Sequence, residues 1–156
     1  MQMTRFLPDE DATLAFGAAL AHALAPGLTI YLVGDLGAGK TTLTRGVLRG
    51  LGYTGKVKSP TYNLVELYNV SRLYLYHFDF YRFADPQEWE DAGFREYFNA
   101  DSVCLVEWPE KAGEFLPAPD LRIELIAEQS GRSLQVHAAT EAGKQCLARL
   151  NSATNS

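Results

Sequence analysis

The stretch GDLGAGKTTLTRG, residues 34–46, decides which fold this sequence forms. It satisfies the pattern G-x-x-x-x-G-K-[ST], with glycines at Gly34 and Gly39, followed by Lys40 and Thr41. Glycine lets the backbone adopt positive φ, and because it has no Cβ it lets backbone amides come close to a phosphate. The pattern therefore predicts a phosphate-binding loop.

The segments on either side of the motif match the context that it requires. LTIYLV, residues 28–33, is a short apolar run typical of a strand buried on both faces, and helix-compatible residues follow the glycine-rich turn. Backbone amides at the start of that helix would point at an anion, at the positive end of the helix dipole. Lys40 would supply a mobile charge for the β- and γ-phosphates, and Thr41 a hydroxyl for Mg²⁺. The residues predicted to surround the phosphates are Gly37, Ala38, Gly39, Lys40, Thr41 and Thr42.

A loop of this kind also needs an acid at the end of a neighbouring apolar strand, where it holds the metal ion or orients its ligands. The sequence offers two such acids, Asp79 in LYLYHFDFYR and Glu107 in VCLVEWPE. Each lies at or just past the C-terminal end of a predicted strand, and open α/β sheets bind their ligands at that edge. Both acids are therefore candidates, and the alternative for either is a surface acid that begins a loop.

The rest of the chain alternates between helix-like and strand-like segments. Helices are predicted over residues 9–25, 87–98 and 140–150. Beyond the strand at 28–33, strands are predicted over residues 63–70, 72–80, 102–107, 121–127 and 133–139. The last two should form a hairpin, and a short polar link joins the first two. We therefore expect one α/β domain of the P-loop NTPase type over residues 1–156, with a central, mostly parallel sheet flanked by helices and antiparallel hairpin additions.

The composition is that of a globular protein. Of the 156 residues, 47% are hydrophobic and 21% are charged, which argues against a disordered chain. No apolar run approaches the roughly 18 residues of a membrane span, and acids occupy the N-terminus where a signal peptide would be apolar, so we expect a cytoplasmic protein without a membrane partner. Cys104 and Cys146 show no metal-binding or redox spacing and are interpreted as reduced thiols, with Cys104 buried in its strand.

The formal net charge of −5 bears on the class of partner. A protein that binds nucleic acid across a broad face is usually basic, so this charge argues against such a face. Any contact with RNA should therefore come through a partner protein.

Four motifs, in this order and spacing, resemble the TsaE family, formerly called YjeE: GDLGAGKTTLTRG, SPTYNLVELY, YHFDFYR and CLVEWPE. The resemblance extends from about residue 7 to about residue 136. It implies a small bacterial ATPase that uses ATP and Mg²⁺. It also implies work with the TsaB and TsaD proteins to form N6-threonylcarbamoyladenosine at position 37 of tRNAs that read codons beginning with A. TsaD would carry out the transfer, and tRNA would be reached indirectly through the complex.

The resemblance also implies roles for individual residues. It assigns Lys40 to the phosphates, and Thr41 together with Glu107 to Mg²⁺. Asp79 corresponds to the Walker B acid of the family, which would polarise the attacking water or hold a metal-bound one. Thr42 would add a hydroxyl near the phosphates. The residues expected to take part in catalysis are thus Asp79, Glu107 and Lys40.

Other residues keep two interpretations. By resemblance, Thr61 in SPTY would sense the γ-phosphate as part of a switch, but Ser59 and Pro60 would also serve simply to turn the chain into a strand. By resemblance, three further residues lie in segments that flank the nucleoside, although each would also suit a solvated surface: Glu10, Lys111 and Arg132.

Three residues near the candidate acids are similarly open. Trp108 would either cover the nucleotide or pack beside the strand. His77 would be either a strand histidine with its own partners or a partner of the site, and Arg82 would contact the phosphates or another protein.

Three classes of function are compatible with these features: an ATPase subunit of a tRNA-modifying assembly, a small-molecule kinase, and a docking module gated by nucleotide without a need for hydrolysis. The chain contains no N-K-x-D guanine-recognition motif, which favours ATP over GTP. It also contains no arginine-rich segment of the kind that forms a kinase lid, which favours the first and third classes.

Overall fold

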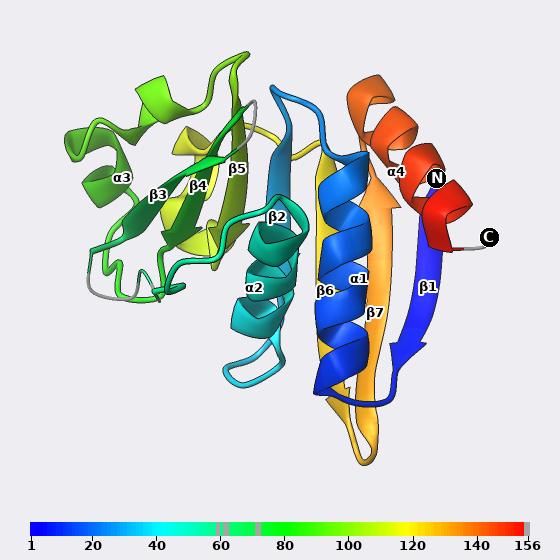
Figure 1. Cartoon of the computed structure of the whole chain (residues 1–156). Coiled ribbons are helices and arrows are strands. Elements are labelled where there is room, and N and C mark those ends of the chain that lie inside the picture. Colours follow the sequence, from blue (N-terminus) through cyan, green and yellow to red (C-terminus); the bar gives the residue numbers. More distant parts are fainter. Residues whose placement is uncertain (59, 61–62, 71–72, 155–156) are drawn as a thin grey trace.

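The fold is built on one seven-stranded sheet with the strand order β1-β7-β6-β2-β5-β4-β3 (Figure 1). The computed structural model describes residues 1–58, 60, 63–70 and 73–154. The strands are β1 (Gln2–Leu7), β2 (Thr29–Val33), β3 (Val65–Val70), β4 (Leu73–Asp79), β5 (Ser102–Glu107), β6 (Leu121–Glu128) and β7 (Gly131–Ala138).

The centre of the sheet is parallel and its two edges are antiparallel. β6, β2, β5 and β4 run parallel to one another, whereas β3 pairs antiparallel with β4, and β7 and β1 continue antiparallel from β6. The predicted α/β layered fold, with a mostly parallel centre and hairpin additions, is therefore confirmed. Within the centre, β2, β5 and β4 end level with one another, because Leu32 pairs with Glu107 and Glu107 with Asp79.

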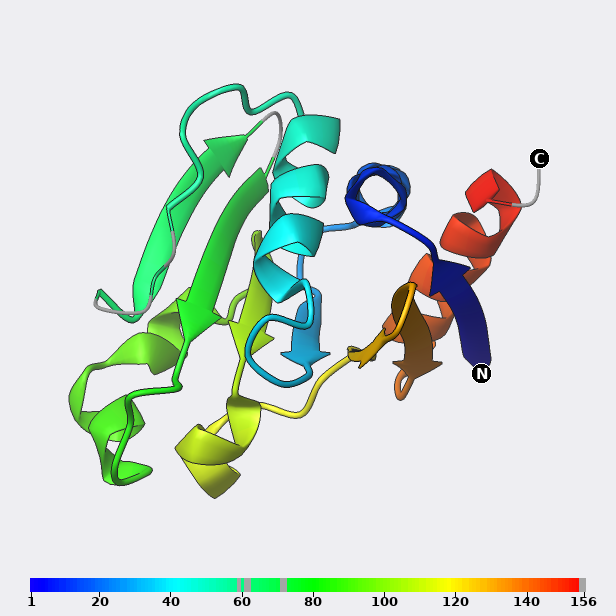
Figure 2. The ribbon, with the colours of Figure 1, turned by 90° about the horizontal axis from the view of Figure 1, so that it is seen from below.

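Helices cover both faces of the sheet (Figure 2). α1 (Glu10–Ala23), α2 (Lys40–Gly50) and α4 (Glu141–Thr154) lie on one face and share its core with the sheet. The short helices α3 (Gln87–Asp91), η1 (Phe94–Tyr97) and η2 (Pro109–Phe115) lie on the other face over β4 and β5. An aromatic-rich core fills that second layer, and it includes Phe78, Phe80 and Trp89.

α1 and α2 pack close together. A Cβ on Gly17 would lie 2.5 Å from the carbonyl oxygen of Leu43, so only glycine permits this approach. α1 begins at a capped position, where the Asp9 carboxylate accepts a hydrogen bond of 2.8 Å from the backbone N–H of Ala12.

Two features differ from what the sequence pattern predicts. β1 was not predicted, because its alternation of exposed and buried residues is short and it pairs with a strand that lies about 130 residues further along the chain. The single helix expected over residues 87–98 is instead two short helices, because Gly93 adopts a left-handed conformation with φ 73° and interrupts them. Among the helices of the described residues, none has the length and apolar character needed to cross a membrane.

The remaining predicted elements are found. The helix predicted over 9–25, the strand over 28–33 and the two hairpins all form, and Cys104 is buried as expected. The C-terminal helix packs onto the domain through Cys146, Leu147 and Leu150, which are all buried.

Candidate functional site

The phosphate-binding motif forms a loop that joins β2 to α2. Gly39 lies immediately before α2 with φ 106°, a left-handed conformation that residues with a Cβ rarely adopt. Within the described part of the chain, no side-chain hydrogen bond caps the start of the helix. The backbone N–H groups of the first turn of this 11-residue helix therefore face the loop, which is the arrangement that binds a phosphate.

Lys40 begins α2 and is almost completely buried, with 4% of its side chain exposed. Its Nζ donates a hydrogen bond of 2.5 Å to the carbonyl oxygen of Gly34 and lies 3.8 Å from Oε1 of Glu107. It also lies 4.2 Å from the centre of the Trp108 ring, a cation–π contact. A buried ammonium with these three contacts is held at the mouth of the loop, where a phosphate would meet it.

The two candidate acids lie side by side at the end of the parallel strands. Asp79 ends β4 and Glu107 ends β5, they are register partners, and both are buried. Oδ1 of Asp79 accepts a hydrogen bond of 2.9 Å from the backbone N–H of Tyr81. Carboxylates are rarely buried unless they are paired or bind a ligand. Two buried carboxylates side by side at this edge of the sheet therefore indicate a candidate ligand site.

His77 contacts Glu107 directly. Its Nε2 lies 2.6 Å from Oε2 of Glu107, and its side chain is fully buried on β4. Of the two interpretations of His77, the structure supports the one in which it is a partner of the site. Glu107 is thus held by His77 through one oxygen and lies near Lys40 through the other.

One cavity of about 350 Å³ brings most of the predicted residues together. Its walls come from the loop, the start of α2 and the ends of β4 and β5. It is lined by Leu36, Gly37, Gly39, Lys40, Thr41, Thr42, Asp79, Glu107, Trp108 and Arg132.

The oxygen atoms around this cavity suit the way in which Mg²⁺ usually binds at phosphate-binding sites. Mg²⁺ takes one or two carboxylates or hydroxyls from the protein and completes its coordination with phosphate oxygens and water. Thr41, Asp79 and Glu107 provide such donors here. In the part of the chain that the structure describes, no group of three or more His, Cys, Asp or Glu side chains is placed to hold a metal by itself. This chemistry fits a metal that arrives with its nucleotide.

Arg132 braces the loop from β7, 94 residues away from it in the sequence. Its Nε donates a hydrogen bond of 2.9 Å to the carbonyl oxygen of Ala38, and one terminal nitrogen donates one of 3.2 Å to Gly37. These two hydrogen bonds tie the loop to β7, so Arg132 helps to hold the loop in its turn.

A second cavity, of about 330 Å³, adjoins the first on the side of α1. Glu10, Thr42 and Arg132 line it, together with the turn between β6 and β7. Glu10 also forms an exposed ion pair of 3.4 Å with Arg45 of α2. Glu10 and Arg132 are therefore placed beside the phosphate loop.

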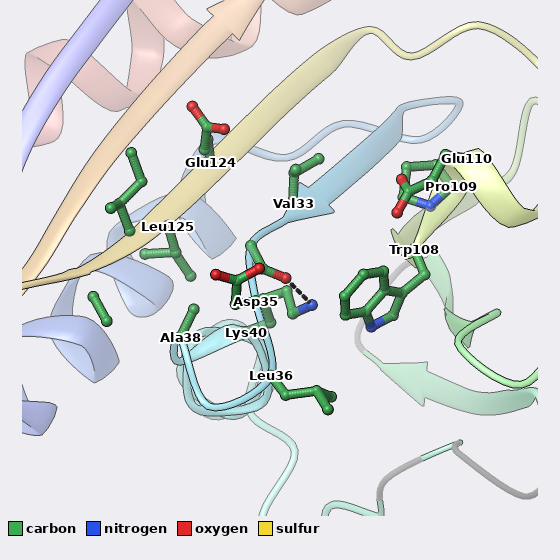
Figure 3. Close-up of a pocket in the computed structure, with 13 residues that line it drawn as sticks. Val33, Asp35, Leu36, Ala38, Lys40, Trp108, Pro109, Glu110, Glu124 and Leu125 are labelled. Atoms are coloured by element: carbon green, nitrogen blue, oxygen red, sulfur yellow. Dashed lines mark hydrogen bonds between the residues drawn. The ribbon is translucent and has the colours of Figure 1, made fainter.

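A third cavity, of about 410 Å³, lies between the loop and β6 (Figure 3). In this view the Trp108 ring lies beside the Lys40 side chain, and Glu124 and Leu125 of β6 form the wall across from it. Trp108 is half-buried, adopts a left-handed conformation with φ 56°, and contacts the Tyr81 ring with the ring centres 5.0 Å apart. Since Trp108 also lines the phosphate cavity, it is a wall of the site rather than a packing residue alone.

One predicted residue of the described chain lies outside these three cavities. Lys111 is exposed in η2, and it does not line any of the three cavities described above. Thr61 lies outside the described residues, as does Ser59.

Sequence reasoning missed several residues of the second cavity. Pro8, Thr13, Gln129 and Ser130 line it, although none carries a motif. The predicted hairpin turn between β6 and β7 is the signal that could have indicated them. It was not enough, because that turn comes close to the start of α1 only once the sheet has formed.

Comparisons with known proteins agree with this fold and site. The profile of the family described as "Threonylcarbamoyl adenosine biosynthesis protein TsaE" matches residues 7–134. A Haemophilus influenzae protein named "tRNA threonylcarbamoyladenosine biosynthesis protein TsaE" is 47% identical over 150 residues, which cover 93% of this chain and 95% of that protein. A Bacillus subtilis protein of the same name is 44% identical over 121 residues, which cover 78% and 74% of the two chains.

A solved structure is also similar over almost the whole chain. The crystal structure of Bacillus subtilis YdiB superposes with a TM-score of 0.84 at 34% identity, over 99% of this chain and 97% of that chain. The family profile covers most of the chain, and the Haemophilus influenzae relative is similar over nearly all of its length. This chain belongs to the TsaE family.

Proposed function

We propose that this protein is a Mg²⁺-dependent subunit that binds and hydrolyses ATP and supports a TsaB–TsaD complex in forming N6-threonylcarbamoyladenosine at position 37 of tRNAs that read codons beginning with A. The observation that carries the proposal is the pairing of Asp79 and Glu107 beside Lys40, at the mouth of the phosphate loop. Its role in tRNA modification is supported by the names of the relatives, which are tRNA threonylcarbamoyladenosine biosynthesis proteins.

Binding of the nucleotide phosphates is the first step. The N–H groups at the start of α2 and the Lys40 ammonium contact the phosphates, and Arg132 keeps the loop in shape from behind. Most of the binding energy then comes from groups that are already in position before the nucleotide binds, because the loop is folded as an anion site. Glu10 and Arg132 flank the nucleoside from the adjoining cavity.

Hydrolysis divides the two acids into separate roles. Glu107 and Thr41 would hold Mg²⁺, which would supply positive charge to offset that of the phosphates. Asp79 lies next to Glu107 on the neighbouring strand, and its carboxylate would orient the attacking water. The protein would position the reacting groups and stabilise their charge, and it would form no covalent bond with the phosphate, as is usual in phosphoryl transfer.

The seven-stranded sheet with its helices acts in this proposal as one P-loop domain over residues 1–156, working in the cytoplasm, where tRNA is modified. The chain has a formal net charge of −5, so the protein would reach tRNA through the TsaB–TsaD complex rather than by direct contact over a broad face.

The proposal is tested by ATP turnover and tRNA modification with purified components. We expect weak turnover by the protein alone and strong stimulation when TsaB and TsaD are added. Glu107→Ala should keep most of the affinity for nucleotide measured without metal but abolish turnover, because the loop amides and Lys40 remain. Glu114→Ala, which removes an exposed acid from η2, should behave like the native protein.

The same experiment separates the other two classes of function. If Glu107→Ala supports repeated rounds of tRNA modification at the native rate, hydrolysis is not needed and the protein is a docking module gated by nucleotide. If turnover rises only when a small hydroxyl compound is added, and labelled phosphate appears on that compound, the protein is a kinase.

A further inference from the structure

His77 is a buried polar residue that the mechanism above does not use. It lies on β4 two residues before Asp79, so the two side chains point to the same face of the strand. On β5 its register partner is Leu105, two residues before Glu107. His77 is therefore the diagonal neighbour of Glu107, close enough for the 2.6 Å contact between Nε2 and Oε2.

The proton of this contact lies on the histidine. An ionised carboxylate can only accept hydrogen bonds, so Nε2 must carry the hydrogen and donate it to Oε2. The other ring nitrogen, Nδ1, is buried and has no hydrogen-bond partner among the residues that the structure describes. A hydrogen on Nδ1 would be buried without an acceptor, which is costly, so the geometry favours the tautomer that carries its hydrogen at Nε2.

This hydrogen bond orients the carboxylate. A glutamate side chain turns about several single bonds, and the Glu107 side chain has only 5% of its surface exposed. His77 holds Oε2 from the strand side, which leaves Oε1 turned toward Lys40 at 3.8 Å and toward the cavity that the phosphate loop also lines. The Glu107 carboxylate has this orientation before a cation or nucleotide binds. Binding therefore costs less conformational entropy, because this side chain is already ordered.

We propose that His77 is a positioning residue: its Nε2–H donates to Oε2 of Glu107 and presents Oε1 of the same carboxylate to the divalent cation that accompanies a nucleotide. This inference rests on the proposed role of Glu107 as a Mg²⁺ ligand. Residues that hold a metal ligand from behind typically alter metal affinity about 10- to 100-fold when they are replaced.

The test compares two substitutions at this position. His77→Gln retains an N–H donor at a similar reach from the strand, whereas His77→Leu fills the space without a donor. The probe is a non-hydrolysable ATP analogue, with binding measured by calorimetry once with MgCl₂ and once with EDTA. We expect Mg²⁺ to tighten binding to the native protein. In His77→Leu that tightening should fall about 10- to 100-fold, with the EDTA affinity within about three-fold of native, and His77→Gln should recover most of the loss.

Phe78→Leu is the matched control, because Phe78 is buried next in the chain but points to the opposite layer and has no contact with Glu107 among the contacts found in the described residues. It should lower the midpoint of thermal unfolding without changing the effect of Mg²⁺. If His77→Leu does not fold, His77→Asn replaces it, because its amide is too short to reach Oε2.

A second measurement does not depend on metal or nucleotide. Long-range ¹H–¹⁵N spectra of the imidazole in the free protein should show His77 protonated at Nε2 and not at Nδ1. A proton on Nδ1 instead of Nε2 would overturn the inference, because the carboxylate would then have no donor.

The outcomes also separate this inference from the proposed function. If Mg²⁺ tightens binding to the native protein and to His77→Leu equally, His77 does not position the metal ligand and only this inference fails. If Mg²⁺ has no effect on the native protein, the proposed metal-dependent function fails, and the positioning of a metal ligand fails with it.

Discussion

Asp79 and Glu107 are register partners at the ends of the neighbouring parallel strands β4 and β5, and both side chains are buried at the edge where the phosphate loop begins. Their environments differ. Glu107 is held by His77 and lies near Lys40, whereas Oδ1 of Asp79 accepts a hydrogen bond from the backbone N–H of Tyr81. This difference is the structural basis for giving the two acids different roles.

The two acids should therefore respond differently to loss of charge. Glu107→Gln should remove most of the tightening of ATP-analogue binding by Mg²⁺, because it replaces a proposed metal ligand. Asp79→Asn should keep that tightening but lower turnover about 10²- to 10⁴-fold, the usual contribution of a group that positions or deprotonates a nucleophile. Calorimetry and a phosphate-release assay would check both. Equal loss of Mg²⁺-dependent binding in the two variants would contradict the division of roles.

Lys40→Met should weaken ATP binding with or without Mg²⁺, because it removes the charge that we propose contacts the phosphates while retaining most of the buried aliphatic chain. We expect a loss of at least about ten-fold in affinity, the size of a charge-assisted contact. Lys144→Met, at an exposed position on α4, is the control and should bind as the native protein does. Native affinity in Lys40→Met would show that the lysine does not contact the phosphates.

Arg132→Ala should loosen the phosphate loop, because it removes hydrogen bonds to the carbonyl oxygens of Ala38 and Gly37. We expect faster hydrogen exchange across residues 34–40 and nucleotide affinity lowered by about ten-fold, equivalent to about 1.4 kcal/mol. Arg122→Ala removes an exposed arginine from β6, and neither loop exchange nor affinity should change. An unchanged exchange rate in Arg132→Ala would mean that the loop holds its turn without the arginine.

Gly17→Ala tests the close contact between α1 and α2. Alanine is favoured over glycine in a helix by about 0.5–1 kcal/mol, but its Cβ would lie 2.5 Å from the Leu43 carbonyl oxygen. Separating the helices should cost more than the helix preference contributes, because overpacking a core costs about 1–3 kcal/mol. We expect a lower free energy of unfolding by urea. His22→Ala, exposed near the end of α1, should change it by less than about 0.5 kcal/mol.

The two buried thiols should make the free energy of unfolding depend on pH in the alkaline range. Burial raises the pKa of Cys104 to about 12 and the pKa of Cys146 to about 11, from an ordinary value of 9.0. The unfolded chain loses these protons near pH 9 while the folded chain keeps them, so the unfolded state binds fewer protons above pH 9. Stability should therefore be fully present below pH 9 and should fall as the pH rises from 9 toward 12.

The measurement is urea unfolding at pH 8 and pH 10, with the double variant Cys104→Ala and Cys146→Ala as the comparison. The variant should be less stable at pH 8, since it leaves small cavities, but should lose less stability between the two pH values. An equal loss in both proteins would show that the thiols do not contribute to the alkaline effect.

Local patterns were enough to predict most elements of the fold. The apolar run over residues 28–33 and the glycine-rich turn after it specify a strand, a loop and the helix α2. Alternating strands that are close in the sequence, such as β6 and β7, pair as a hairpin, because a short turn between them leaves few other arrangements. The acids Asp79 and Glu107 were identifiable because each follows an apolar strand.

The sequence by itself therefore determined the phosphate loop, the two candidate acids and the α/β class, because each depends on residues within one segment or on neighbouring segments. Only the tertiary structure decided that β4 lies directly beside β5, so that Asp79 faces Glu107, and that His77 reaches Glu107. It also decided that Arg132 braces a loop 94 residues away and that β1 joins the sheet. These contacts depend on strand order and on packing across the whole sheet, which no local pattern of residues encodes.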